Sequence, residues 1–330
     1  MNSDSLSFYE TKTLAGTVDV IGIPIDIGKD AAGTAEAPKY LRSQGLLKML
    51  AALGFNVNDL GDLDCPQNGE SLIKGDKNCK YLEAIAKISE EVAALIASSV
   101  KAGHKVVALG GDHSMSLGTI SGAAAGTEDE LGVIWIDAHG DMNTPETTLS
   151  GNIHGMPAAA LMGFGHPRLV NILRPGAKVK PANWLFIGLK DLDQTEIDLI
   201  RREKLEAVTM LDLATHGLHQ VTEKIKALAS RVKNIWVSVD IDAIDKEYAP
   251  ATLMSTAGGL TYREITLIAK YIGRLCPVVG LDIAEQVVTK DIDAKTAKLV
   301  FELISNLLGS EYSWYTEYMN AEAKKQAERS

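Results

Sequence analysis

Short apolar segments alternate with amphipathic helical segments along this 330-residue chain, and this alternation constrains its fold more than any other feature. Strands are predicted at residues 18–25, 105–109, 133–136, 184–188, 234–239 and 278–283, and helices at about 35–53, 81–102, 114–125, 194–202, 216–232, 262–275 and 294–308. Parallel strands need a long crossover connection, which is usually a helix. We therefore predict a three-layer α/β/α sandwich with a mostly parallel central sheet.

The length and the hydrophobic content of 46% allow one large core or two small ones. No linker, internal repeat or low-complexity segment divides the chain. We predict a single domain over residues 1–330, with residues 1–15 and 320–330 peripheral to it.

The net charge of −10 argues against nucleic acid and anionic membrane surfaces as partners and is compatible with a cationic small substrate. The three cysteines, Cys65, Cys79 and Cys276, lack the spacing of paired metal ligands and are expected to be reduced thiols. The N-terminus lacks the pattern of a secretory signal, and no apolar run reaches transmembrane length. These observations predict a cytoplasmic protein.

Polar residues follow four of the predicted strands directly. They are His113, the group Asp137, His139 and Asp141, the pair Asp240 and Asp242, and Glu285. If the strand at 133 continued to residue 141, its alternation would point the first group to one side. Ligands of parallel sheets bind beyond the carboxyl ends of the strands, so we expect all of these side chains at one site.

Carboxylates mixed with imidazoles form a hard ligand set that suits Mn²⁺, Zn²⁺ or Fe²⁺. Taken singly, an Asp-x-Asp after a strand is more often a capping feature, and a histidine after Gly-Gly-Asp is more often an ordinary loop residue. Their joint occurrence favours a metal site. Two histidines and four aspartates exceed the needs of one tetrahedral ion, and two metals would lower the pKa of a water toward about 7.

Three motifs carry a family resemblance: Gly110-Gly-Asp-His-Ser114, Asp137-Ala-His-Gly-Asp141 and Ser238-Val-Asp-Ile-Asp-Ala-Ile-Asp245. They resemble the ureohydrolase family, manganese enzymes that hydrolyse guanidinium groups to urea and an amine. Residues 141–157 look most like the arginases of that family. The resemblance implies a binuclear Mn²⁺ cluster and the hydrolysis of L-arginine to L-ornithine and urea.

The resemblance also implies a ligand set. One Mn²⁺ would be bound by His113, Asp137, Asp141 and Asp240, and the other by Asp137, His139, Asp240 and Asp242. Asp141 would in addition help to hold the nucleophile. His154 matches the histidine credited with proton transfer, and Glu285 matches the carboxylate that pairs with the guanidinium.

Short polar side chains of the loop after the metal motif hold the substrate α-carboxylate in arginases. The matching residues are Asn143, Thr148 and Ser150, with Asn152 beside them, and Asp193 matches the aspartate that binds the α-ammonium. Each of these residues taken alone is more simply explained by turn hydrogen bonds, so the interpretation depends on the whole loop.

One segment departs from the arginase pattern. Leu253, Met254 and Ser255 stand where arginases have Gly-Thr-Pro, so Met254 replaces a hydroxyl near the guanidinium end of the site. Two alternatives stay open for this reason. One is another ureohydrolase, of agmatinase or guanidinobutyrase type, and the other is an arginase-like protein with little turnover and a binding or regulatory role. The resemblance further implies a homotrimer or homohexamer.

Overall fold

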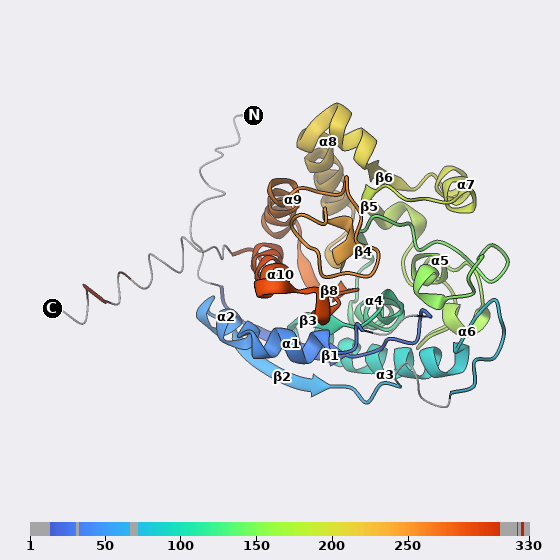
Figure 1. The fold of residues 1–330 in the computed structure, drawn as a ribbon, viewed down its shortest axis with the longest axis horizontal. Helices are drawn as coiled ribbons and strands as arrows, with labels where there is room; N and C mark the ends of the chain where they lie inside the picture. Colours follow the sequence, from blue (N-terminus) through green and yellow to red (C-terminus); the bar gives the residue numbers. More distant parts are fainter. Residues whose placement is uncertain (1–13, 31–32, 67–71, 311–321, 323–324, 327–330) are drawn as a thin grey trace.

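A computed structural model describes residues 14–30, 33–66, 72–310, 322, 325 and 326, and its centre is an eight-stranded sheet (Figure 1). The strand order is β2-β1-β3-β8-β7-β4-β5-β6, and every neighbouring pair is parallel. The strands are β1 Thr17–Ile23, β2 Asn56–Asp62, β3 Lys105–Gly110, β4 Leu131–Ile136, β5 Trp184–Leu189, β6 Glu206–Thr209, β7 Asn234–Asp240 and β8 Val278–Ala284.

Helices cover both faces of this sheet. They are α1 Ala37–Ser43, α2 Leu46–Ala52, α3 Leu82–Lys101, α4 Ser116–Gly126, α5 Pro157–Leu161, α6 Pro167–Val170, α7 Gln194–Glu203, α8 Met210–Arg231, α9 Tyr262–Leu275 and α10 Lys295–Leu307. Alternate residues of one strand enter different cores: Ile134 belongs to the core that includes residues of α1, α2, α8, α9 and α10, whereas Trp135 belongs to the core that includes residues of α3 to α6. The predicted three-layer α/β/α architecture is confirmed.

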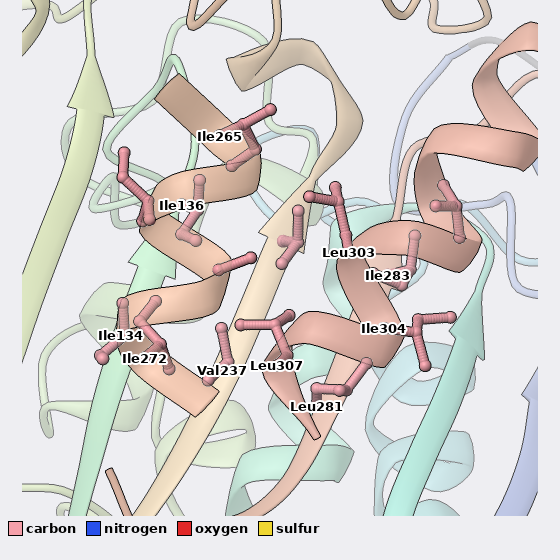
Figure 2. Close-up of a cluster of buried hydrophobic side chains, with 14 of the residues drawn as sticks. Ile134, Ile136, Val237, Ile265, Ile272, Leu281, Ile283, Leu303, Ile304 and Leu307 are labelled. Atoms are coloured by element: carbon pink, nitrogen blue, oxygen red, sulfur yellow. The ribbon is translucent and has the colours of Figure 1, made fainter. Parts of the chain in front are cut away.

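Figure 2 shows how one of these layers is built. Isoleucine and leucine side chains of α9 and α10 point down onto the strands β4, β7 and β8. Ile272 of α9 and Ile304 of α10 are fully buried there, against strand residues such as Val237 and Leu281. This packing fixes the middle of the sheet, from which most of the polar side chains at the strand ends emerge.

Several element boundaries differ from the prediction. The helix expected at 35–53 is two helices, because Gly45 adopts a left-handed conformation (φ 101°) and breaks it. The strands β2 and β6 were not predicted, since β2 is a polar, largely exposed edge strand and β6 has only four residues. Helix α8 begins at Met210 rather than at 216, with a kink at Gly217. The predicted peripheral segments at the two termini lie largely outside the described residues.

The strand order decides where the polar residues meet. β7 and β8 come last in the sequence, yet they lie between β3 and β4 in the sheet. The carboxyl ends of β3, β8, β7 and β4, which carry the predicted site residues, are therefore consecutive neighbours. Among the described residues, no helix combines the length and the apolar character needed to cross a membrane.

The packing under α10 generates a stability prediction. Replacing Ile304 by alanine should lower the free energy of unfolding by about 2–5 kcal/mol, because it opens a cavity in a fully buried cluster. Chemical denaturation followed by circular dichroism measures this change. Leu211→Ala is the matched control, since Leu211 is largely exposed and its truncation should cost less than about 1 kcal/mol. Equal effects of the two changes would contradict the assignment of this core.

Candidate metal and substrate site

The polar residues after β4 lie in a loop, because the strand ends at Ile136. The condition of the alternation argument, a strand that continues to residue 141, is therefore not met, although Asp137, His139 and Asp141 do converge. Two local features hold the loop: Asp137 Oδ1 accepts a hydrogen bond from the backbone N–H of His139 at 2.8 Å, and Asp141 has a left-handed backbone (φ 49°). A non-glycine residue in that region is strained, which is common at functional sites.

The first cluster of ligand-type atoms surrounds Nδ1 of His113. The carboxylate oxygens near this nitrogen are Asp137 Oδ2 at 3.2 Å, Asp141 Oδ2 at 3.2 Å and Asp240 Oδ2 at 3.3 Å. Ligands about 2.1 Å from a common ion lie about 3.0–3.4 Å apart, depending on the coordination angle. His113 Nδ1 is buried and has no hydrogen-bond partner among the described residues. An unpartnered buried nitrogen facing three carboxylates fits a cation-binding position.

The second cluster adjoins the first. His139 Nδ1 lies 3.2 Å from Asp242 Oδ2 and 3.5 Å from Asp137 Oδ1. In the part of the chain that the structure describes, Asp242 Oδ1 is also buried without a hydrogen-bond partner. Asp137 thus presents Oδ2 to one cluster and Oδ1 to the other, as a bridging carboxylate would. The residues present fit two metal ions, and either group could hold one.

The electrostatics of these groups call for positive charge. Burial and the neighbouring carboxylates of Asp242 and Asp137 raise the pKa of Asp240 well above its usual value. Burial and Asp137 likewise raise the pKa of Asp242 to about 6. Carboxylates that repel one another in a buried site are stabilised in their charged forms by cations.

A hydrogen-bonded chain behind His113 sets its tautomer. Asp282 is fully buried and accepts hydrogen bonds from Trp236 Nε1 at 2.7 Å and from the hydroxyl of Ser238 at 2.5 Å. Since Ser238 donates its proton to Asp282, its oxygen is left to accept from His113 Nε2 at 2.8 Å. A proton on Nε2 leaves the Nδ1 lone pair free to bind a metal. The sequence analysis did not identify this chain, because its members come from different strands.

Glu285 lies at the end of β8, beside the clusters, and is almost fully buried. Its Oε1 accepts from the backbone N–H of His113 at 3.0 Å and from His154 Nδ1 at 3.3 Å, while its Oε2 forms an ion pair with Lys29. Burial opposes the charge of Glu285, but Lys29 and His154 lower its pKa. Lys29 was not singled out from the sequence, since a lone lysine in a loop gives no local signal.

The predicted substrate-binding residues fall into two sets. Asn143 and Asp193 are brought together, with Asn143 Nδ2 donating to Asp193 Oδ2 at 2.8 Å. Buried Glu196, which the sequence analysis also missed, joins their segments by accepting from the backbone N–H groups of Met142 and Asp193. Burial raises the pKa of Glu196 to about 7.

The second set lies further along the same loop. Thr148 Oγ1 accepts from the N–H of Gly151 at 2.9 Å, and Ser150 Oγ accepts from the N–H of Asn152 at 3.2 Å. Asn152 Oδ1 accepts from Lys80 Nζ at 3.0 Å. These contacts are turn and loop hydrogen bonds. They give the loop its shape and do not by themselves assign substrate contacts to Thr148, Ser150 or Asn152.

Met254 lies in a loop that is anchored next to Glu285. Thr252 forms an isolated antiparallel bridge with Gln286, and Lys290 Nζ donates to the carbonyl of Thr252 at 2.8 Å. The side chain of Met254 itself is 55% exposed. The departure from the arginase pattern therefore places an apolar, solvent-exposed side chain in a loop that is anchored beside Glu285.

Comparison with known proteins assigns the chain to a class of binuclear metal hydrolases. The sequence model described as the arginase family matches residues 17–309. The arginase of Bacillus caldovelox is 36% identical over 293 residues, which cover 88% of this chain and 98% of that protein. The chain therefore belongs to the arginase family, whose members are hydrolases acting on amidine C–N bonds with a binuclear metal centre.

Solved structures give the same result. The native structure of Bacillus caldovelox arginase has a TM-score of 0.86 and covers 90% of this chain and 99% of that one. An Entamoeba histolytica arginase in complex with L-ornithine has a TM-score of 0.82 at 30% identity, covering 89% and 98%. The agmatine ureohydrolase of Thermoplasma volcanium is more distant, at 20% identity and a TM-score of 0.67 with 92% of both chains covered, and shares the fold.

The hydrogen bonds that link Asp282, Ser238 and His113 generate a prediction about metal affinity. Ser238→Ala should weaken Mn²⁺ binding about 10–100-fold, because His113 loses the hydroxyl that selects its tautomer. Calorimetric titration of metal-free protein measures the affinity. Ser305→Ala is a matched control, since this buried serine hydroxyl has no hydrogen-bond partner within the described part of the chain. Unchanged affinity in Ser238→Ala would contradict the tautomer argument.

Proposed function

We propose that the protein is an arginase that hydrolyses L-arginine to L-ornithine and urea with two Mn²⁺ ions. One observation carries the proposal above all: two adjoining clusters of ligand-type atoms share Asp137 and lie beside the buried carboxylate of Glu285. His113, Asp137, Asp141 and Asp240 would hold one ion, and Asp137, His139, Asp240 and Asp242 the other. Bound there, the ions supply a hydroxide nucleophile from water near neutral pH.

Glu285 is the proposed acceptor for the substrate guanidinium. A planar fork of N–H donors pairs best with a carboxylate that can offer both oxygens. The backbone N–H of His113 orients this carboxylate by a hydrogen bond of 3.0 Å. The guanidinium carbon would then lie near the two clusters of ligand-type atoms, where Asp141 would help to hold the nucleophile.

His154 is the proposed proton donor to the leaving amine. Its side chain is 29% exposed, so it can exchange protons with solvent, and its Nδ1 lies 3.3 Å from Glu285 Oε1. Burial opposes the charged form, but Glu285 raises the pKa of His154 above its usual value. A histidine held in this way carries the proton that an amine needs in order to leave.

The α-amino acid end of arginine would lie toward the loop that follows the metal motif. Asp193 is a carboxylate suited to the α-ammonium group, and its hydrogen bond with Asn143 supports a shared role for the two residues. We assign Asn143, Thr148, Ser150 and Asn152 to the α-carboxylate on the basis of the family resemblance. The homotrimeric or homohexameric assembly and the cytoplasmic location stay predictions.

A substrate panel tests the proposal. Protein preincubated with Mn²⁺ should release urea from L-arginine much faster than from agmatine or guanidinobutyrate, because only arginine has the α-amino acid group that the loop would bind. Asp137→Ala should lose both metal ions and all activity, since its carboxylate belongs to both clusters. A clear preference for agmatine or guanidinobutyrate would favour the other ureohydrolases, and full metal content in Asp137→Ala would refute the ligand assignment.

Met254 tests the alternative of an arginase-like protein with little turnover. If the protein is a competent arginase, Met254→Thr should change kcat/KM for arginine by no more than about tenfold, the effect of one added hydrogen bond. The exposure of Met254 supports this expectation. Steady-state kinetics at equal metal content measure the change. A gain of several hundredfold would instead identify the natural protein as a catalytically weakened one.

A further inference from the structure

The carboxylate proposed to bind the substrate guanidinium already has a cationic partner from its own chain. Lys29 Nζ forms an ion pair with Glu285 Oε2, and both residues are about 5% exposed. Burial opposes the charge of Lys29, but Glu285 and Asp112 raise its pKa, so the side chain is an ammonium. Two opposite charges removed from water in direct contact neutralise each other at this position.

The backbone beside Lys29 is held from two sides. The N–H of Gly28 donates to Asp112 Oδ2 at 2.7 Å, and the carbonyl of Gly28 accepts from the N–H of His154 at 3.0 Å. A Cβ atom at Gly28 would lie 2.4 Å from Asp112, so only glycine allows this close approach. These two hydrogen bonds of Gly28 direct Lys29 toward Glu285 rather than toward solvent.

Glu285 has little capacity left for another bidentate partner. Oε1 accepts from the backbone of His113 and from His154, and Oε2 accepts from Lys29. A guanidinium that is to engage both oxygens needs the place of the Lys29 ammonium. The backbone donor of His113 is fixed by the strand end, whereas Lys29 is a long side chain with several rotatable bonds. Lys29 is therefore the partner that can move.

We propose that Lys29 occupies the guanidinium position of the free site, and that arginine binds by displacing its ammonium from Glu285. This inference rests on the proposed function. It makes Lys29 a specificity-determining residue, because a ligand has to compete with an intramolecular cation. If the Lys29 ammonium is away from Glu285 in about one tenth of the free protein molecules, the apparent affinity for arginine is about tenfold lower than that of a site without this lysine.

Lys29→Gln tests the displacement. Glutamine retains an N–H donor for Glu285 but removes the competing charge, so KM for L-arginine should fall about tenfold while kcat changes by less than about threefold. Lys29→Arg keeps the charge and should retain the high KM.

A matched control separates this effect from a general change of charge. Lys74→Gln removes a lysine that pairs with Asp30, next to Lys29 in the sequence, but Lys74 is 53% exposed at its side chain, unlike the buried Lys29. Its kinetics should match those of the natural protein. A KM that rises or stays constant in Lys29→Gln, or that falls equally in Lys74→Gln, would overturn the proposal.

A failure of the inference can be told from a failure of the proposed function. If the natural protein hydrolyses L-arginine but Lys29→Gln does not lower KM, the displacement is refuted while the arginase assignment stays intact. If neither the natural protein nor Lys29→Gln hydrolyses arginine with two metals bound, the proposed function fails and the inference fails with it.

Discussion

Mutual repulsion of buried carboxylates is the interaction on which the rest of this structure depends. Asp137, Asp141, Asp240 and Asp242 are all buried within a small region, and burial together with the charge of Asp137 raises the pKa values of Asp240 and Asp242. Such a group is stable only if the surrounding protein is rigid and if positive charge is available. The sheet supplies the rigidity, because its central strands are covered by helices on both faces (Figures 1 and 2).

The same rigidity allows strained backbone at the site. Asp141 and Glu285 both have positive φ angles, of 49° and 67°, each of which costs on the order of 1–3 kcal/mol for a residue with a side chain. Buried polar neighbours orient the functional groups in turn. Asp282 and Ser238 set the tautomer of His113, and Glu196 ties the metal loop to the start of α7. The site thus combines residues that are strained or that repel one another with buried polar residues whose hydrogen bonds hold them in place.

Local sequence patterns were sufficient to predict many of the strands and helices of this structure. Apolar runs such as 133–136 and the periodicity of 81–102 predicted the strands and helices that form the two cores. The edge strand β2 escaped notice because its residues are mostly polar and exposed, and the break at Gly45 was hidden in an otherwise helical stretch. Elements whose residues are buried were therefore predicted better than elements at the margin of the sheet.

The sequence by itself determined which residues end the strands, and hence that carboxylates and imidazoles would face the carboxyl edge of a parallel sheet. Only the tertiary structure decided which of them meet, because β7 and β8 insert between strands that precede them by more than 90 residues. The ion pair of Lys29 with Glu285 joins residues that are 256 positions apart in the sequence, and no local pattern predicts it. Strand ends follow from local hydrophobic periodicity, whereas side-chain partners depend on the order in which distant strands pack.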